Sequence, residues 1–417
     1  MGRTLDAATL ERILEVTRRL AAPFELSEML GEVIDAGRAV LAADRGTVFL
    51  YDDKTDELVV RVGTGIETIR IPADRGIAGE CARSRQIINV PDCYADSRFN
   101  PEVDRSSGYR TRCLLAVPLI GHDDSLVGVL QLLNKEDGTF DERDEKIAAS
   151  FAAQCAVALQ RARMTEELVV KEKMEHELSL AREIQMGFLP REMPRLTGYE
   201  LAGTSRPADE TGGDTYDAVS IDDTKAVLLL GDATGHGVGP ALSATQVRAM
   251  LRIALRLGAG LDATISNIND QLEQDLADNR FVTAFLGVLD AVAHRVTYHA
   301  AGQGPLLHFR AASGTFDWHK STTVPLGFIS PLLLDGSATI DLAPGDILGL
   351  ITDGVFEYEN PDGEQFEEAG VETLIRRHHE EPMERLVELL LQEVDRFGDT
   401  VPQADDITIV LVKRLPA

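Results

Sequence analysis

The chain has 417 residues, of which 41 are Lys or Arg and 69 are Asp or Glu, and its formal net charge is −28. A hydrophobic content of 44% and a charged content of 26% are typical of folded proteins, and the length suggests two or three domains. Such a negative protein is repelled by nucleic acids and anionic membrane surfaces, so we expect neither as a partner. No apolar run reaches the roughly 20 residues of a membrane span, and residues 1–20 do not resemble a signal peptide, which predicts a cytoplasmic protein.

The first part of the chain predicts an α+β domain. Apolar residues at three- and four-residue spacing indicate an N-terminal helix within residues 1–24 and a second helix from Leu26. Runs rich in β-forming residues follow at 47–51, 58–62, 114–120 and 126–133, and the last two predict an antiparallel hairpin. A closing helix from Asp141 to about Leu159 completes a domain of residues 25–160. The four cysteines (Cys81, Cys93, Cys113 and Cys155) form no Cys-x-x-Cys pair, which argues against structural zinc and a disulfide framework.

A charged stretch without Gly or Pro follows, from about Gln160 to Met186. Its apolar seam starts at Met164 and Leu168 and resumes in a shifted phase at Met174. This pattern predicts a short, imperfect coiled coil that pairs two copies of the chain, and the alternative is a solvated single helix. Prolines at 190 and 194 end the helix, so we assign residues 161–189 to a linker and 190–417 to a second domain.

The second domain alternates strands and helices. Runs of β-forming residues lie at 226–230, 283–289, 296–300, 347–352 and 407–412, and helical patterns lie at about 240–257, 261–277, 369–378 and 384–397.

Aspartates follow several of these apolar runs next to glycines, at Asp214, Asp232, Asp353 and the pair Asp405-Asp406. One such Asp is usually turn chemistry, but four positions in one domain, each beside a strong strand, indicate a common site. Clustered carboxylates stay ionised together only if a cation compensates them, and oxygen ligands without a Cys or His cluster select Mg²⁺ or Mn²⁺. Two such ions about 4 Å apart can bind a phosphate ester and supply a hydroxide for in-line attack. The residues therefore predict a metal-assisted hydrolase of phosphoesters.

Residues from about 180 to 413 resemble the SpoIIE-type, RsbU-like branch of the PPM metal-dependent serine/threonine phosphatases. Seven blocks match in order: 181–190, 212–217, 231–237 with 240–242, 300–305, 325–327, 344–346 with 352–354, and 404–408. The resemblance implies an αββα sandwich that holds two Mn²⁺ or Mg²⁺ ions at one edge of its two sheets.

The same resemblance implies roles for individual residues. Asp232 would bridge both ions and the carbonyl of Ala233 would join one of them. Asp214 would hold the second ion, while Asp353 and Asp405 would hold the first, with Asp406 as the alternative to its neighbour. In one departure, this chain has Gln303 where many relatives have a His, and Gln cannot transfer a proton.

The first domain contains Asn134-Lys135, Phe140 and Asp144-Glu145, together with characteristic runs at 71–79, 89–92, 98–101 and 109–112. This set resembles the regulatory GAF domains of cyclic-nucleotide phosphodiesterases and adenylyl cyclases. Six positions match the family's pocket wall and suit a purine edge and a cyclic phosphate: Ile77, Ala78, Asn100, Ser107, Thr111 and Gln131. Two alternatives remain, a GAF domain that serves only for dimerisation and a Lys135–Asp144 ion pair that holds the pocket shut without touching nucleotide.

Taken together, the patterns predict an α+β multidomain enzyme: a GAF sensor, a helical linker and a PPM-type phosphatase, acting as a homodimer. The predicted substrate is phosphoserine or phosphothreonine on a partner protein, which in RsbU-like systems is a STAS-domain anti-anti-sigma factor. The predicted regulatory ligand is cAMP or cGMP. The competing hypothesis is a non-catalytic scaffold that binds its partner without hydrolysis. A cyclase or phosphodiesterase is a third possibility, but the chain has no second catalytic motif.

Overall fold

The computed structural model describes Arg18 and residues 26–63, 69–277 and 280–416, without the side chains of residues 61–63, 69, 103, 106 and 107. The helix expected within residues 1–24 therefore lies outside the described residues, apart from Arg18. The chain divides into two compact units, Met1–Lys173 and Met174–Ala417. No described helix combines the length and apolar character that crossing a bilayer requires.

The first unit is built on a six-stranded antiparallel sheet with the strand order β3-β2-β1-β6-β5-β4. Its strands are β1 (Ala43–Asp52), β2 (Glu57–Gly63), β3 (Ile69–Pro72), β4 (Ile88–Val90), β5 (Leu114–Ile120) and β6 (Leu126–Lys135). Its helices are α2 (Leu26–Leu41), α3 (Gly76–Ser84), α4 (Glu102–Ser107) and the start of α5 (Glu142–Phe188), with a 3₁₀ turn at Cys93–Ala95. The predicted hairpin of β5 and β6 is confirmed.

Both faces of this sheet are covered. On one face, α2 and the first turns of α5 bury a core that includes Leu30, Leu130 and Phe151. The opposite face packs against α3 through residues such as Val60, Ile77 and Val129. Alternation along β6 explains the arrangement, because successive side chains of a strand point to opposite faces.

Helix α5 continues without interruption from Glu142 to Phe188, so the expected closing helix and the expected linker form one element. Its first turns are buried, whereas its later apolar residues are exposed, for example Leu168 (59%) and Met174 (63%). A long helix that exposes apolar side chains gains little from burial within its own chain.

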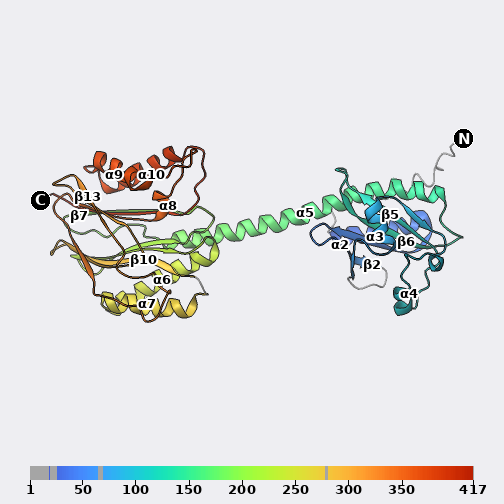
Figure 1. The fold of residues 1–417 in the computed structure, drawn as a ribbon, viewed down its shortest axis with the longest axis horizontal. Helices are drawn as coiled ribbons and strands as arrows, with labels where there is room; N and C mark the ends of the chain where they lie inside the picture. The colour runs from blue at the N-terminus through green and yellow to red at the C-terminus, as the bar shows by residue number, and fades with distance from the viewer. Residues whose placement is uncertain (1–17, 19–25, 64–68, 278–279, 417) are drawn as a thin grey trace. The chain divides into compact units, whose positions relative to one another are not determined.

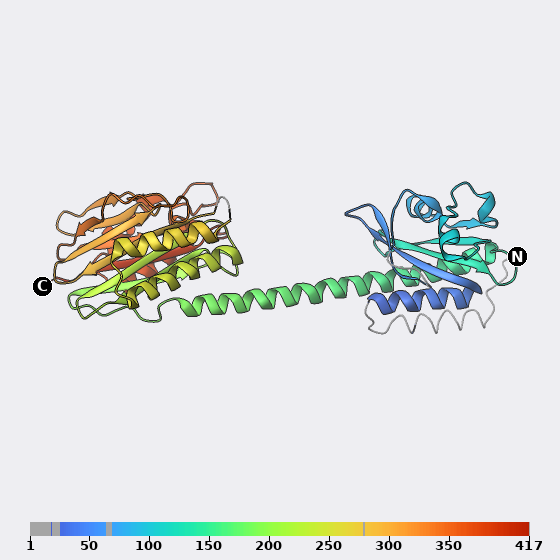
Figure 2. The ribbon, with the colours of Figure 1, turned by 90° about the horizontal axis from the view of Figure 1, so that it is seen from below.

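The second unit is a sandwich of two five-stranded sheets (Figures 1 and 2). One sheet has the order β14-β11-β10-β9-β8, with β8 (Asp214–Ser220), β9 (Lys225–Ala233), β10 (Val282–Asp290), β11 (Arg295–Ala301) and β14 (Ala338–Asp341). The other has the order β13-β12-β15-β16-β7, with β7 (Tyr199–Arg206), β12 (Leu306–Arg310), β13 (Thr315–His319), β15 (Ile347–Ile351) and β16 (Ile407–Arg414).

Helices cover both outer faces of the sandwich. Helices α6 (Val238–Arg256) and α7 (Leu261–Asp275) pack on the first sheet, and α9 (Glu367–His378) and α10 (Met383–Gly398) pack on the second. Figure 1 shows the two helix pairs on opposite sides of the strands, and the short helix α8 (Asp353–Phe356) lies near the second sheet. A third core fills the space between the sheets. The predicted αββα sandwich is thus confirmed.

Candidate functional site

The aspartates singled out in the sequence stand at the ends of strands in both sheets of the sandwich. Asp214 begins β8 and Asp232 lies one residue before the end of β9, and the two are direct partners in the antiparallel register. Asp353 is the first residue of α8 and lies two residues after the end of β15, and the pair at 405 and 406 immediately precedes β16. Four separate segments therefore bring carboxylates to one edge of the sandwich.

Glycines allow these segments to approach one another. A Cβ on Gly213 would lie 2.5 Å from the carbonyl oxygen of Ala233, and a Cβ on Gly354 would lie 2.0 Å from the carbonyl oxygen of Asp406. Distances this short exclude any side chain, so the Gly-Gly-Asp and Thr-Asp-Gly sequences fit backbone contact as well as turn formation.

Hydrogen bonds fix two of the carboxylates. Asp214 is buried, and its Oδ2 accepts a hydrogen bond of 2.9 Å from the hydroxyl of Thr352. Asp406 accepts backbone N–H bonds on both oxygens, at 2.8 Å from Ala208 and at 3.2 Å from Asp214. Because both its oxygens already bind backbone groups, Asp406 is better suited to holding the loop than to binding an ion.

Burial and mutual repulsion raise the pKa values of Asp214, Asp232, Asp353 and Asp405. Burial raises the pKa of Asp214 well above its usual range, and the neighbouring Asp232 raises it further. Burial raises the pKa of Asp232 to about 7, with further contributions from Asp353 and Asp405. The pKa values of these last two carboxyls are also raised, chiefly by burial. The site therefore concentrates more negative charge than it can easily hold ionised.

The donor set fits a hard divalent cation. It consists of carboxylate oxygens with a backbone carbonyl nearby, and within the described part of the chain no Lys or Arg forms an ion pair with Asp214, Asp232, Asp353 or Asp405. Among the side chains that the structure describes, no three His, Cys, Asp or Glu residues already converge on one point as an ion would require. The carboxylates nevertheless influence one another's pKa values, and ion binding would require their side chains to reorient toward a common point.

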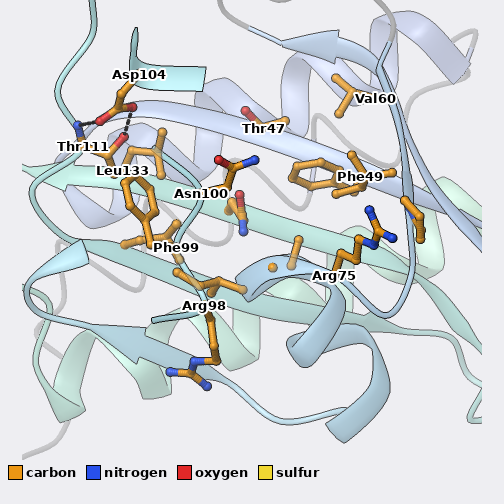
Figure 3. A pocket seen from close by; sticks show the side chains of 17 residues that line it. Thr47, Phe49, Val60, Arg75, Arg98, Phe99, Asn100, Asp104, Thr111 and Leu133 are labelled. Carbon is orange, nitrogen blue, oxygen red and sulfur yellow. Dashed lines mark hydrogen bonds between the residues drawn. The ribbon is translucent and has the colours of Figure 1, made fainter. Parts of the chain in front are cut away.

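A second candidate site lies in the first unit, where a cavity of about 350 Å³ opens between the sheet and α3. Five of the six positions proposed from the sequence line it, namely Ile77, Ala78, Asn100, Thr111 and Gln131. The sixth, Ser107, ends α4, and its side chain is outside the described part. In Figure 3, Asp104 and Thr111 lie on one side of the cavity and Arg75 on the other.

The polar groups of the cavity differ in their availability. Asp104 is buried and accepts hydrogen bonds from the Thr111 amide (2.7 Å), the Thr111 hydroxyl (2.8 Å) and the Tyr94 hydroxyl (2.9 Å). Arg98 is paired with Asp96, whereas Arg75 is exposed and has no ion-pair partner among the described residues. Of the charged lining residues that the structure describes, Arg75 is thus an unpaired cation and Asp104 is already hydrogen-bonded, which suits an anionic ligand.

The Asn-Lys-Phe-Asp-Glu set lies outside this cavity. Asn134 accepts from the amides of Arg112 (2.6 Å) and Cys113 (3.3 Å), and it donates to the Tyr109 hydroxyl and the Arg110 carbonyl. Lys135 forms an ion pair with Asp144 at the start of α5. The bonds of Asn134 anchor residues 109–113, which include the cavity-lining Thr111, so Asn134 supports the cavity wall without lining the cavity itself.

Comparison with known families decides the assignment. The family model described as Stage II sporulation protein E (SpoIIE) matches residues 222–415, and the GAF domain model matches residues 25–159. The chain carries a GAF domain followed by a SpoIIE-type phosphatase domain.

Individual relatives resemble parts of this chain. The SiaA-PP2C domain of Pseudomonas aeruginosa matches with a TM-score of 0.52 and 23% identity, over 59% of this chain and 99% of that one, which shows the fold. A cGMP-specific 3′,5′-cyclic phosphodiesterase of Drosophila ananassae is 32% identical over 196 residues, and a probable 3′,5′-cyclic phosphodiesterase, pde-5, of Caenorhabditis elegans is 31% identical over 171. These matches cover 42% and 37% of this chain but only 17% and 23% of the two relatives.

Several residues of the SpoIIE-type domain acquire roles that the sequence did not suggest. Thr352 bonds to Asp214, and its hydroxyl also accepts from the amide of Thr408 at 2.9 Å, which ties β16 to the site. Gln303, which replaces a His of many relatives, is buried and accepts a hydrogen bond from the Thr283 hydroxyl. Thr352 stands in a recognised motif, whereas nothing in the sequence pairs Thr283 with Gln303.

The GAF domain likewise has pocket residues that the sequence reading missed. Arg75, Arg98 and Asp104 all line the cavity. Arg98 belongs to the run 98–101 that resembles the GAF family, but the sequence did not indicate that it lines the cavity or that it pairs with Asp96. Asp104 lies on the short helix α4, which no periodicity predicts because it has only six residues.

Proposed function

We propose that the SpoIIE-type domain hydrolyses phosphoserine or phosphothreonine on a partner protein with the help of two divalent cations, Mn²⁺ or Mg²⁺. The observation that carries the proposal is the position of carboxylates from four segments at one edge of the sandwich, where burial and mutual repulsion raise their pKa values. Bound cations would relieve this repulsion, and they would supply an activated water and charge neutralisation for the phosphoryl group.

Each aspartate has its own role in the proposed metal centre. Asp232, with the carbonyl of Ala233, is central because it pairs directly with Asp214 and its pKa, raised first by burial, is also raised by Asp353 and Asp405. Asp214 contributes from the adjacent β8, and Asp353 and Asp405 contribute from the second sheet. Asp406 orients the loop before Asp214 through its backbone bonds.

The substrate proposal rests on the RsbU-like character of the sequence blocks. Phosphatases of that type act on a phosphorylated STAS-domain anti-anti-sigma factor, and we propose such a protein as the partner here. Neither a nucleic acid nor a membrane fits the net charge of −28.

For the GAF domain we propose regulation by a cyclic nucleotide. The cavity of about 350 Å³ has apolar walls, an exposed Arg75 at its rim and the amide of Gln131 within. These groups suit a purine with a single anionic phosphate. Similarity to a cGMP-specific phosphodiesterase favours cGMP, with cAMP as the alternative.

Homodimerisation completes the proposal. The exposed apolar seam of α5 would be buried if two copies paired through it, with the GAF domain as a further contact.

Hydrolysis of a phosphorylated STAS-domain protein by the full-length chain tests the function. Metal-free protein is expected to be inactive, and added Mn²⁺ or Mg²⁺ is expected to restore phosphate release, with a panel of cyclic nucleotides changing the rate. Tight binding of the phosphoprotein without phosphate release would instead favour the scaffold hypothesis.

A further inference from the structure

The end of α5 holds the backbone of the loop that precedes Asp214. The side-chain amide of Gln185 donates to the carbonyl of Gly212 at 2.6 Å and accepts from the amide of the same residue at 3.2 Å. One turn earlier, Arg182 donates to the carbonyl of Asp209 at 2.9 Å. Residues three apart lie on the same face of a helix, so both bonds connect one face of α5 to one loop.

Gly212 in turn packs directly on the carboxylate cluster. A Cβ at this position would lie 2.4 Å from an oxygen of Asp406, so only glycine allows this contact. The same Asp406 binds the amide of Asp214, and the carbonyl of Gly213 accepts from the amide of Ala233 at 3.1 Å. The Gly212 peptide that Gln185 binds therefore connects to both strands of the candidate centre. It reaches β8 through Asp406, which binds the amide of Asp214, and β9 through the neighbouring Gly213, which binds the amide of Ala233.

The contact depends on polar groups rather than on burial. Gln185 is half-buried, while Ile184 and Phe188 beside it are exposed. Apolar packing against the inter-sheet core starts only after the helix, at Leu189 and Met193. Hydrogen bonds from a half-buried side chain are easily made and broken, since each contributes about 1 kcal/mol net.

We propose that Gln185 is a positioning residue for the metal centre: its amide fixes the Gly212 peptide, which packs on the loop-holding Asp406, and thereby sets Asp214 for cation binding. The inference rests on the proposed function, because it presumes that the centre binds divalent cations. Gln185 belongs to the helix that begins at Glu142 in the GAF domain. A change in the conformation of α5 would therefore reach the centre through this contact, provided that it favours one of two states of the loop.

The test measures Mn²⁺ binding directly, by isothermal titration calorimetry on metal-free full-length protein. We expect Gln185→Ala to weaken Mn²⁺ binding about tenfold, as the loss of one or two hydrogen bonds would. Phosphatase activity should return at excess Mn²⁺ with an unchanged KM for p-nitrophenyl phosphate, whereas a merely structural loss would not respond to metal. Ser179→Ala, an exposed position on the same helix, is the matched control and should bind like the wild type.

Two further variants keep the test decisive. Gln185→Glu retains an acceptor for the Gly212 amide but loses the donor, and we expect intermediate affinity; it also replaces the alanine variant if that protein fails to fold. Arg182→Ala should weaken binding less, because Asp209 lies farther along the loop from the centre. Equal Mn²⁺ affinity in the wild type and in both Gln185 variants would overturn the role of Gln185 but leave the proposed function intact. Absence of Mn²⁺ and Mg²⁺ binding to the wild type would instead overturn the proposed function.

Discussion

Asp214 and Asp232 are direct cross-strand partners in the antiparallel pair of β8 and β9. Like charges at such positions destabilise a sheet, and here both side chains are also largely removed from solvent. The first sheet of the sandwich therefore bears an electrostatic cost at its edge, which a bound cation would turn into an attraction. This relationship yields opposite expectations for stability and for catalysis.

Replacing Asp232 with Asn should separate the effect on stability from the effect on catalysis. We expect phosphate release to fall on the order of a hundredfold or more, because the central metal-binding carboxylate is lost. The unfolding temperature of the metal-free protein should rise by roughly 2–4 °C at pH 8, since about 1 kcal/mol of repulsion corresponds to such a shift. The measurements are p-nitrophenyl phosphate hydrolysis with Mn²⁺ and differential scanning calorimetry. Asp223→Asn, an exposed position in the turn before β9, should change neither.

The same carboxylates predict a pH dependence. A carboxyl whose pKa is raised by folding destabilises the protein as pH rises from its unfolded pKa, near 4, to its folded pKa, about 7 for Asp232. The metal-free protein should thus lose stability between pH 5 and pH 7.5, and added Mn²⁺ should raise the unfolding temperature more at pH 7.5 than at pH 5, where protons compete with it. An equal metal-induced shift at both pH values would contradict the assigned site.

The amount that could be read from the sequence differs between backbone and side chains. The long β-runs and helices of both domains were predictable because their apolar periodicity is strong, whereas the αββα arrangement followed from the resemblance to the PPM phosphatases. β8 was not predicted, since its buried Asp217 and Thr215 give no apolar run, and their burial depends on tertiary partners such as Arg252. Likewise, Gln185 and Gly212 lie 27 residues apart and nothing local indicates that they meet.

The GAF cavity predicts a measurable ligand response. If cGMP binds there, a concentration of 100 times its Kd should stabilise the GAF domain by about 2.7 kcal/mol. Gln131→Leu removes the amide that lines the cavity and should weaken binding about tenfold. Gln86→Leu changes an exposed glutamine that does not line the cavity, so its binding should match the wild type. Calorimetric titration with cGMP and cAMP measures both, and equal loss in the two variants would exclude this cavity.

Asn134 should matter for stability rather than for ligand contact. Asn134→Ala removes four hydrogen bonds that anchor residues 109–113, and we expect a loss of about 2–4 kcal/mol in the free energy of unfolding of the GAF domain. Asn134→Asp keeps the acceptor for Arg112 and Cys113 but loses both donors, so its loss should be smaller. Urea unfolding followed by near-ultraviolet circular dichroism measures the difference, and equal losses would show that the two bonds accepted by Asn134 contribute nothing.

The seam of α5 predicts a dimer that a single charge disrupts. Leu168 belongs to the predicted seam, whereas Val169 lies about 100° farther around the helix and about 140° from Met174, where the seam resumes. Leu168 and Val169 are similarly exposed in one chain, at 59% and 58%. Leu168→Lys should shift the protein from dimer to monomer in sedimentation velocity at micromolar concentration, because it places a charge in each copy at the seam. Val169→Lys introduces the same charge outside the seam and should remain dimeric. If both variants sediment like the wild type, α5 does not pair two copies through this seam.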